Sequence, residues 1–180
     1  TRISDDRYII KMENEKPYGM GVFIDIYPYD GLGTTEKEAV TYGMKGDRLS
    51  SLCYQSTREH FAIETTTSLF RKIIKYPVFI GSKLIGKDYF QKKLNQLVKL
   101  KEYEDSNYIG CVIWLSGGKK EIFLRKWFDE TVMVPFEKYQ FRVPKDYDEV
   151  LRHTYGDYMQ LPPEKDRIGH HYFKAYRKDE

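Results

Sequence analysis

The sequence predicts a mixed α+β fold, formed by one domain of 180 residues. Strand-like runs lie near both ends of the chain, and a long stretch with helical spacing separates them. Hydrophobic residues make up 41% of the chain, which is enough to build a core at this length. The sequence has no internal repeat and no low-complexity tract, so one α+β unit is the economical interpretation.

Two strands are expected near the N-terminus. Residues 8–12 are a weak strand candidate. The run at residues 22–28 is rich in β-branched and aromatic residues and is bounded by glycine and proline, which predicts a second strand. This strand has a buried character, and the carboxylate of Asp25 projects from its middle. Asp30 and Gly31 then predict a turn.

A helix is expected after this turn. Thr34 and Thr35, followed by Glu38, are typical of a helix start because a threonine hydroxyl can accept from a backbone amide of the first turn. The helix is expected to run to about residue 55. The glycines at residues 43–46 predict a break within it.

The stretch at residues 68–104 is also predicted to be mostly helical, because its apolar residues recur at helical spacing. Pro77 and Gly81 are expected to interrupt it. Its many lysines indicate a solvated face, and a role on anionic lipid is the alternative. These lysines are Lys83, Lys87, Lys92, Lys93, Lys99 and Lys101.

The second half of the chain predicts further short elements. A strand at 107–115 is followed by a Gly117-Gly118 turn and a short helix at 121–128. A hairpin comes next, with strands at 131–136 and 140–143 joined through 137–139. Asp146 then caps a helix that ends near 154. The remainder is predicted to be mostly loop.

Composition excludes several classes of protein. The net charge of +3, from 30 basic and 27 acidic residues, is not the basic excess of a nucleic-acid-binding protein. The 2 cysteines indicate neither a disulfide framework nor a zinc site, so a reducing, cytoplasmic compartment is expected. No run approaches the roughly 20 apolar residues of a membrane span. The chain begins without methionine, and we expect a further segment upstream.

The first candidate site contains Asp25 and Asp30. A carboxylate on a buried strand is costly unless it is paired or binds a metal ion, and carboxylate oxygens suit Mg²⁺ and Mn²⁺. The two residues could supply part of a divalent-ion site but not all of it. For Asp30, a plain turn role is the favoured interpretation, whereas for Asp25 a functional role is favoured.

The second candidate site lies in residues 155–171. Arg167 offers a planar fork for a phosphate group. His170 and His171 could donate to phosphate, move protons or bind metal, and adjacent histidines on an extended segment point in opposite directions. Hydrogen-bonded structural histidines are the alternative. The chain contains no Ser-His-Asp order, no P-loop and no GxGxxG motif.

The same segment also holds tyrosines and a carboxylate. Asp157 could act as an acid or base, or it could cap the adjacent turn. Tyr155 and Tyr158 could line a substrate pocket, and such rings attract a quaternary ammonium group. Ordinary packing is the alternative for the tyrosines.

Six groups of residues follow one another along the chain in an order that resembles the LicD family, which is similar to fukutin-type proteins. They are Gly21-Val-Phe-Ile-Asp-Ile-Tyr-Pro-Tyr-Asp-Gly31, Phe141-Arg-Val-Pro-Lys-Asp-Tyr147, Leu151, Tyr155-Gly-Asp-Tyr-Met159, Pro162-Pro163 and Arg167-Ile-Gly-His-His171. The resemblance implies a nucleotidyltransferase-like mixed sheet with flanking helices. It also implies metal-dependent transfer of phosphocholine, or a related phospho-alditol, from a CDP-linked donor such as CDP-choline to a glycan.

The resemblance further implies roles for individual residues. Mg²⁺ or Mn²⁺ would neutralise the donor diphosphate, and Arg167 with one of the two histidines would stabilise developing phosphate charge. The predicted catalytic residues are Asp25, Asp157, His170 and His171, with Asp25 also a metal ligand, and the predicted substrate-binding residues are Asp30, Tyr155, Tyr158 and Arg167.

The chain departs from the family pattern in one respect. The family motifs begin with a glycine-rich turn and an aspartate cluster, which this sequence does not contain. We therefore expect residues 1–180 to be a single LicD-like domain that lacks an N-terminal piece. The expected acceptor is a bacterial cell-surface glycan such as teichoic acid, lipopolysaccharide or a capsule precursor, reached from the inner face of the membrane. A non-catalytic glycan- or partner-binding module of the same family is the alternative.

Overall fold

The computed structural model describes residues 2–12, 20–61, 69–115, 118–164, 167 and 173–178. The chain divides into two compact units. One unit combines Thr1–Pro28 with Met159–Glu180, and the other is Tyr29–Tyr158. The described part contains four α-helices and small antiparallel sheets, which confirms the predicted mixed α+β class.

The first unit holds two pairs of antiparallel strands. β1 (Arg2–Ser4) pairs with β3 (Phe23–Asp25), and β2 (Tyr8–Met12) pairs with β9 (Phe173–Arg177). The weak strand candidate at 8–12 is therefore confirmed. The strand predicted at 22–28 is shorter than expected and not buried, since 70% of Ile24 is exposed. β9 replaces the loop that was predicted near the C-terminus.

The second unit contains a three-stranded antiparallel sheet. Its order is β4 (Asp30–Gly33), β5 (Tyr108–Gly110) and β6 (Ile122–Leu124). The turn predicted at Asp30-Gly31 is wrong, because both residues belong to β4. The single helix predicted at 121–128 is also wrong, because β6 separates the short 3-10 helices η1 (Gly118–Glu121) and η2 (Arg125–Phe128).

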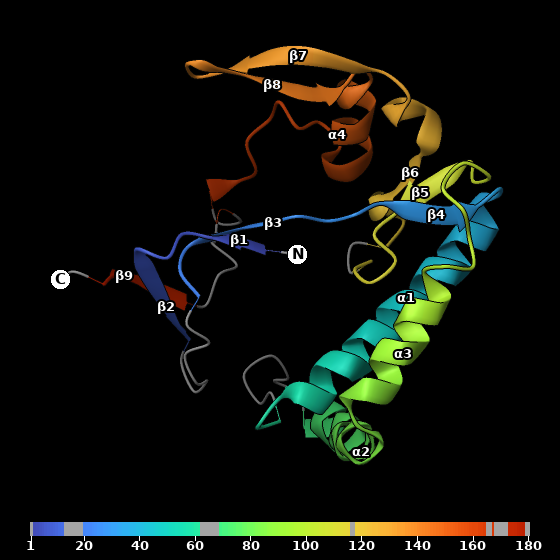
Figure 1. The fold of residues 1–180 in the computed structure, drawn as a ribbon, viewed down its shortest axis with the longest axis vertical. Coiled ribbons are helices and arrows are strands. Elements are labelled where there is room, and N and C mark those ends of the chain that lie inside the picture. The colour runs from blue at the N-terminus through green and yellow to red at the C-terminus, as the bar shows by residue number, and fades with distance from the viewer. Residues whose placement is uncertain are drawn as a thin grey trace. The chain divides into compact units, whose positions relative to one another are not determined.

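Three helices pack together beside this sheet. α1 (Glu36–Thr57) and α3 (Lys87–Leu97) lie side by side, and α2 (Leu69–Ile85) lies at the end of this pair that is away from β4–β6 (Figure 1). α1 runs unbroken through its glycines, contrary to prediction. Pro77 lies inside α2 without ending it, and the chain instead breaks at Gly86, whose φ is 85°.

The N-terminus of α1 is capped as predicted. The hydroxyl of Thr35 accepts from the backbone amide of Glu38 at 3.3 Å, and the carboxylate of Glu38 accepts from the backbone amide of Thr34 at 3.0 Å. This reciprocal arrangement satisfies two amides that have no partner inside the helix. Local sequence therefore decides where α1 starts.

The core of the second unit lies between α1, α3 and the sheet. Its buried members are Leu32, Ala39, Leu97, Val112, Leu115 and Ile122. The segment after β5 approaches α1 at Gly43 and Gly46, where a side chain would meet Leu115 and Val112. The two glycines thus permit close packing of backbone against helix.

A hairpin and one helix complete the second unit. β7 (Thr131–Phe136) and β8 (Tyr139–Pro144) pair in antiparallel register, with Glu137 at φ 52° in the connection, as the sequence predicted. α4 (Tyr147–Tyr155) follows with Asp146 at its N-cap, although the Asp146 side chain makes no capping hydrogen bond. Within the described ranges, no helix is both long and apolar enough to cross a membrane.

Candidate functional site

Asp25 lies at the end of β3 in the first unit. Its Oδ1 accepts from Nε of Arg2 at 2.7 Å, and its Oδ2 accepts from the hydroxyl of Tyr27 at 3.4 Å. Both carboxylate oxygens therefore face donors. A metal ion at Asp25 would have to compete with the Arg2 guanidinium.

Asp30 lies in β4, in the second unit. Its carboxyl is partly buried, and this burial raises its pKa. The pKa values of Tyr42 and Cys111 are raised mainly by burial, with a further contribution from the negative charge of Asp30. Asp30 is therefore a partly buried carboxylate whose charge acts on the Tyr42 phenol and the Cys111 thiol.

The described residues do not make a complete metal site. Asp25 and Asp30 belong to different units, and the described ranges contain no group of three histidine, cysteine, aspartate or glutamate side chains placed to hold an ion. Mg²⁺ takes six oxygen ligands in octahedral geometry, commonly one or two from carboxylates and the rest from water and substrate phosphates. The described residues alone do not gather such a set of ligands.

Tyr155, Asp157 and Tyr158 lie around the C-terminal end of α4. The hydroxyl of Tyr158 donates to Asp148 at 2.6 Å, and this bond lowers the pKa of the Asp148 carboxyl, with a further contribution from Arg152. Tyr155 is 69% exposed, and Asp157 is exposed as well. Tyr158 thus ties the turn back to the first turn of α4, while the other two side chains are open to solvent.

Arg167 belongs to the first unit. Its Nε donates to the carbonyl of Pro162 at 2.8 Å, which holds the guanidinium close to its own loop. His170 and His171 lie outside the described residues. The predicted C-terminal site is therefore divided at Met159, with the tyrosines and Asp157 in one unit and Arg167 in the other.

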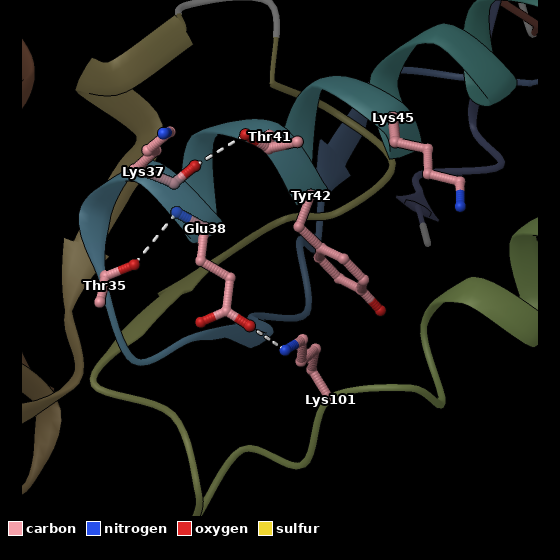
Figure 2. A pocket seen from close by; sticks show the side chains of 7 residues that line it. All are labelled: Thr35, Lys37, Glu38, Thr41, Tyr42, Lys45 and Lys101. Atoms are coloured by element: carbon pink, nitrogen blue, oxygen red, sulfur yellow. Dashed lines mark hydrogen bonds and ion pairs between the residues drawn. The ribbon is translucent and has the colours of Figure 1, made fainter.

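A basic pocket of about 500 Å³ lies between the first half of α1 and the segment after α3 (Figure 2). Glu38, Tyr42 and Lys45 come from successive turns of α1, and Lys101 faces them from the other side. The full lining is Thr35, Lys37, Glu38, Thr41, Tyr42, Lys45 and Lys101. Three ammonium groups and one carboxylate give the pocket a net positive charge.

One ion pair orders this basic pocket. Lys101 donates to the Glu38 carboxylate, and this hydrogen bond holds the pKa of Glu38 at about 2. The hydroxyl of Tyr42 donates to the carbonyl of Leu97 and so ties α1 to the end of α3. In the part of the chain that the structure describes, Lys37 and Lys45 pair with no carboxylate. The pocket can therefore bind an anion through two free cations.

Sequence reasoning missed the basic pocket. Thr35 and Glu38 were recognised only as a helix start, and Lys101 only as one lysine of a solvated face. A second hollow, of about 280 Å³, also contains basic residues and was also missed. It is lined by Thr34, Asn107, Tyr108, Leu124, Arg125 and Lys126. Short-range motifs carry no signal for a pocket whose walls are about sixty residues apart.

Comparison with known proteins identifies a relative. The chain is 32% identical over 157 residues, or 86% of its length, to the lipopolysaccharide cholinephosphotransferase LicD of Haemophilus influenzae. The chain belongs to the LicD family. The LicD-family chain spans 57% of the length of this relative. No family model and no solved structure matches the chain itself.

Family membership confirms what the ordered motifs predicted. The site residues predicted for this LicD-family chain stay predictions, because the comparisons assign no role to any of them. The nucleotidyltransferase-like sheet also stays a prediction. The single-domain interpretation of residues 1–180 likewise stays a prediction beside the two compact units described above.

Proposed function

We propose that this chain takes part in the transfer of phosphocholine, or a related phospho-alditol, to a cell-surface glycan. The observation that carries the proposal is the identity of 32% over 86% of the chain with a lipopolysaccharide cholinephosphotransferase. The donor is a CDP-linked alcohol such as CDP-choline, and the acceptor is lipopolysaccharide, teichoic acid or a capsule precursor. The reaction takes place at the cytoplasmic face of the cell membrane.

The proposal includes a nucleotidyltransferase-like fold and a requirement for Mg²⁺ or Mn²⁺. Asp25 is the carboxylate that the family resemblance assigns to this metal, which would have to displace the Arg2 guanidinium from it. The metal would supply charge neutralisation at the donor diphosphate. No group of described residues completes the coordination of such an ion.

The basic pocket supports binding of an anionic substrate. Lys37 and Lys45 are exposed and line a hollow large enough for a phosphorylated group. The ion pair between Glu38 and Lys101 joins the two walls of the pocket. We propose that this pocket binds a phosphate-bearing part of the donor or of the acceptor.

The test measures transfer and binding separately. The chain is incubated with choline-labelled CDP-choline, Mg²⁺ and lipopolysaccharide that lacks phosphocholine, and label on the glycan is counted. Labelled glycan is the expected result. Calorimetry with CDP-choline and with lipopolysaccharide is run in parallel. Glycan binding without any transfer would support the non-catalytic module instead, and absence of both transfer and binding would refute the proposal.

A paired variant tests the basic pocket. Lys37→Gln with Lys45→Gln removes both free cations, and we expect weaker binding of the phosphorylated substrate. Lys138→Gln on the β7–β8 connection removes one charge at a distance from the pocket and is the control. Equal substrate affinity in the pocket variant and the control would exclude a role for the pocket.

A further inference from the structure

The outer face of α2 exposes several apolar side chains among the described residues. Helix residues three and four apart share a face, and Ile73, Pro77, Ile80 and Leu84 follow that spacing. All four are exposed, with Ile73 at 64% and Leu84 at 83%. Phe79, which points to the other side, is buried. α2 therefore buries Phe79 and Ser82 on one side and exposes an apolar stripe on another.

The exposed stripe belongs to a wider apolar surface. Its flanks carry further exposed apolar side chains, namely Ile74, Tyr76, Val78 and Ile85, and Tyr89 follows in the first turn of α3. α2 occupies the end of the α1–α3 pair (Figure 1), so this surface lies at one extremity of the second unit. A contiguous apolar surface of this kind marks an interaction site in a folded protein.

The charges of α2 have a single sign. The helix contains four basic residues and no acidic one, and Lys87 adds a further cation at the start of α3. The basic residues of α2 are Arg71, Lys72, Lys75 and Lys83. Lys83 is exposed and follows Ile80 by three residues, so its ammonium group lies at the edge of the exposed stripe. Asp88 follows Lys87 in α3, but α2 itself carries cations and no acidic residue. An exposed apolar stripe on such a helix is complementary to an apolar layer that carries anions.

We propose that the outer face of α2 docks on the surface of an anionic lipid membrane. The helix has 17 residues and would be about 26 Å long, which suits a helix lying in the plane of the headgroups. The apolar stripe would enter the acyl boundary, and Lys83 and Lys87 would contact lipid phosphates. A second copy of α2 fits less well, because it would bring further cations against the first set. The proposal does not depend on the transferase assignment.

Vesicle sedimentation tests the proposal. The chain is mixed with vesicles of phosphatidylcholine alone and with vesicles in which about a third of the lipid is phosphatidylglycerol. We expect binding to the anionic vesicles, with weakening by added salt. Leu84→Asp should reduce the partition coefficient by at least about tenfold, because burial of one leucine is lost. Lys83→Gln and Lys87→Gln should each reduce it by about fivefold.

Matched controls separate docking from general stickiness and misfolding. Met133→Asp replaces an apolar residue of β7 that is 57% exposed, and it should leave the partition coefficient unchanged. Far-ultraviolet circular dichroism checks that each variant keeps its helices. Wild-type chain that stays in the supernatant, or binds neutral vesicles equally well, would overturn the proposal. A dimer in analytical ultracentrifugation that Leu84→Asp dissociates would overturn it as well, in favour of a second copy.

Discussion

Replacing Gly46 with alanine should destabilise the protein, although alanine favours helices. Gly46 lies in the middle of α1, where the segment after β5 crosses close by. A Cβ atom at this position would collide with the carbonyl oxygen of Val112 and would lie 2.6 Å from its Cγ1. A backbone oxygen cannot rotate away, so the helix and the crossing segment would have to separate.

The expected change in the free energy of unfolding follows from two opposing contributions. Alanine is favoured over glycine inside a helix by about 1 kcal/mol. Overpacking of a well-packed core costs about 1–3 kcal/mol, and the upper part of that range applies because the obstacle is backbone. The net loss for Gly46→Ala is therefore about 2 kcal/mol of the free energy of unfolding. A Cβ atom added at Gly81 in α2 would meet no described atom outside its own helix backbone within 4 Å, so Gly81→Ala should instead stabilise by about 1 kcal/mol.

Urea unfolding followed by far-ultraviolet circular dichroism measures both variants. Gly43→Ala is an informative third variant, because the obstacle there is the side-chain end of Leu115, at 2.6 Å, which can rotate. It should fall between the other two. The reasoning would be refuted if Gly46→Ala unfolded at the same urea concentration as the wild type or at a higher one, with an unchanged slope.

Three further predictions concern polar groups of the second unit. Thr35→Ala should lower the free energy of unfolding by about 1 kcal/mol through loss of the cap, and Thr35→Asp should restore it in urea titrations. Glu38 has its pKa lowered to about 2 by Lys101, so its contribution is present above the ordinary value of 4.5 and is lost as pH falls toward 2. Glu38→Gln should flatten that acid loss in unfolding measured against pH. Asp30 has a pKa raised by burial, so its ionised form opposes folding and stability falls as pH rises through the raised pKa. Asp30→Asn should therefore be more stable than wild type at neutral pH, and a less stable variant would contradict the assignment.

Local signals were sufficient for several elements. The start of α1 was predictable because the Thr35 cap and Glu38 act within one turn. The β7–β8 hairpin was predictable because its strands are joined by a short connection. In both cases the residues that decide the structure are neighbours in the sequence.

Long-range contacts explain the errors. Gly46 suggested a break in α1, whereas its function is to admit Val112, which lies far along the chain. Asp30 and Gly31 suggested a turn, but β5 pairs with them and makes a strand. β9 was missed because its partner, β2, lies at the opposite end of the sequence. In each case tertiary pairing overrides local preference.

The residues of the candidate site show the same contrast between local and long-range signals. Asp25 was identifiable as an isolated carboxylate in an apolar run, but its partner Arg2 was not, because the two are paired across β1 and β3. The basic pocket was not identifiable at all. Its walls come from α1 and from the segment around Lys101, and only packing of α1 against α3 brings them together.

In α2, apolar residues at helical spacing lie on both a buried face and an exposed face. Apolar residues at helical spacing ordinarily indicate a face buried in the core, and α2 does bury Phe79. Leu84 follows the same helical spacing but on another face, where it is 83% exposed among the described residues. A helix that only closed the core would gain by having polar residues there, because exposed apolar side chains favour association. A docking surface that uses both Leu84 and the neighbouring Lys83 would explain why this face is apolar. Leu84→Asp should then leave folding intact, because the Leu84 side chain is already solvated, and it should abolish docking. Unfolding of the Leu84→Asp variant in water would show instead that this face is part of the core.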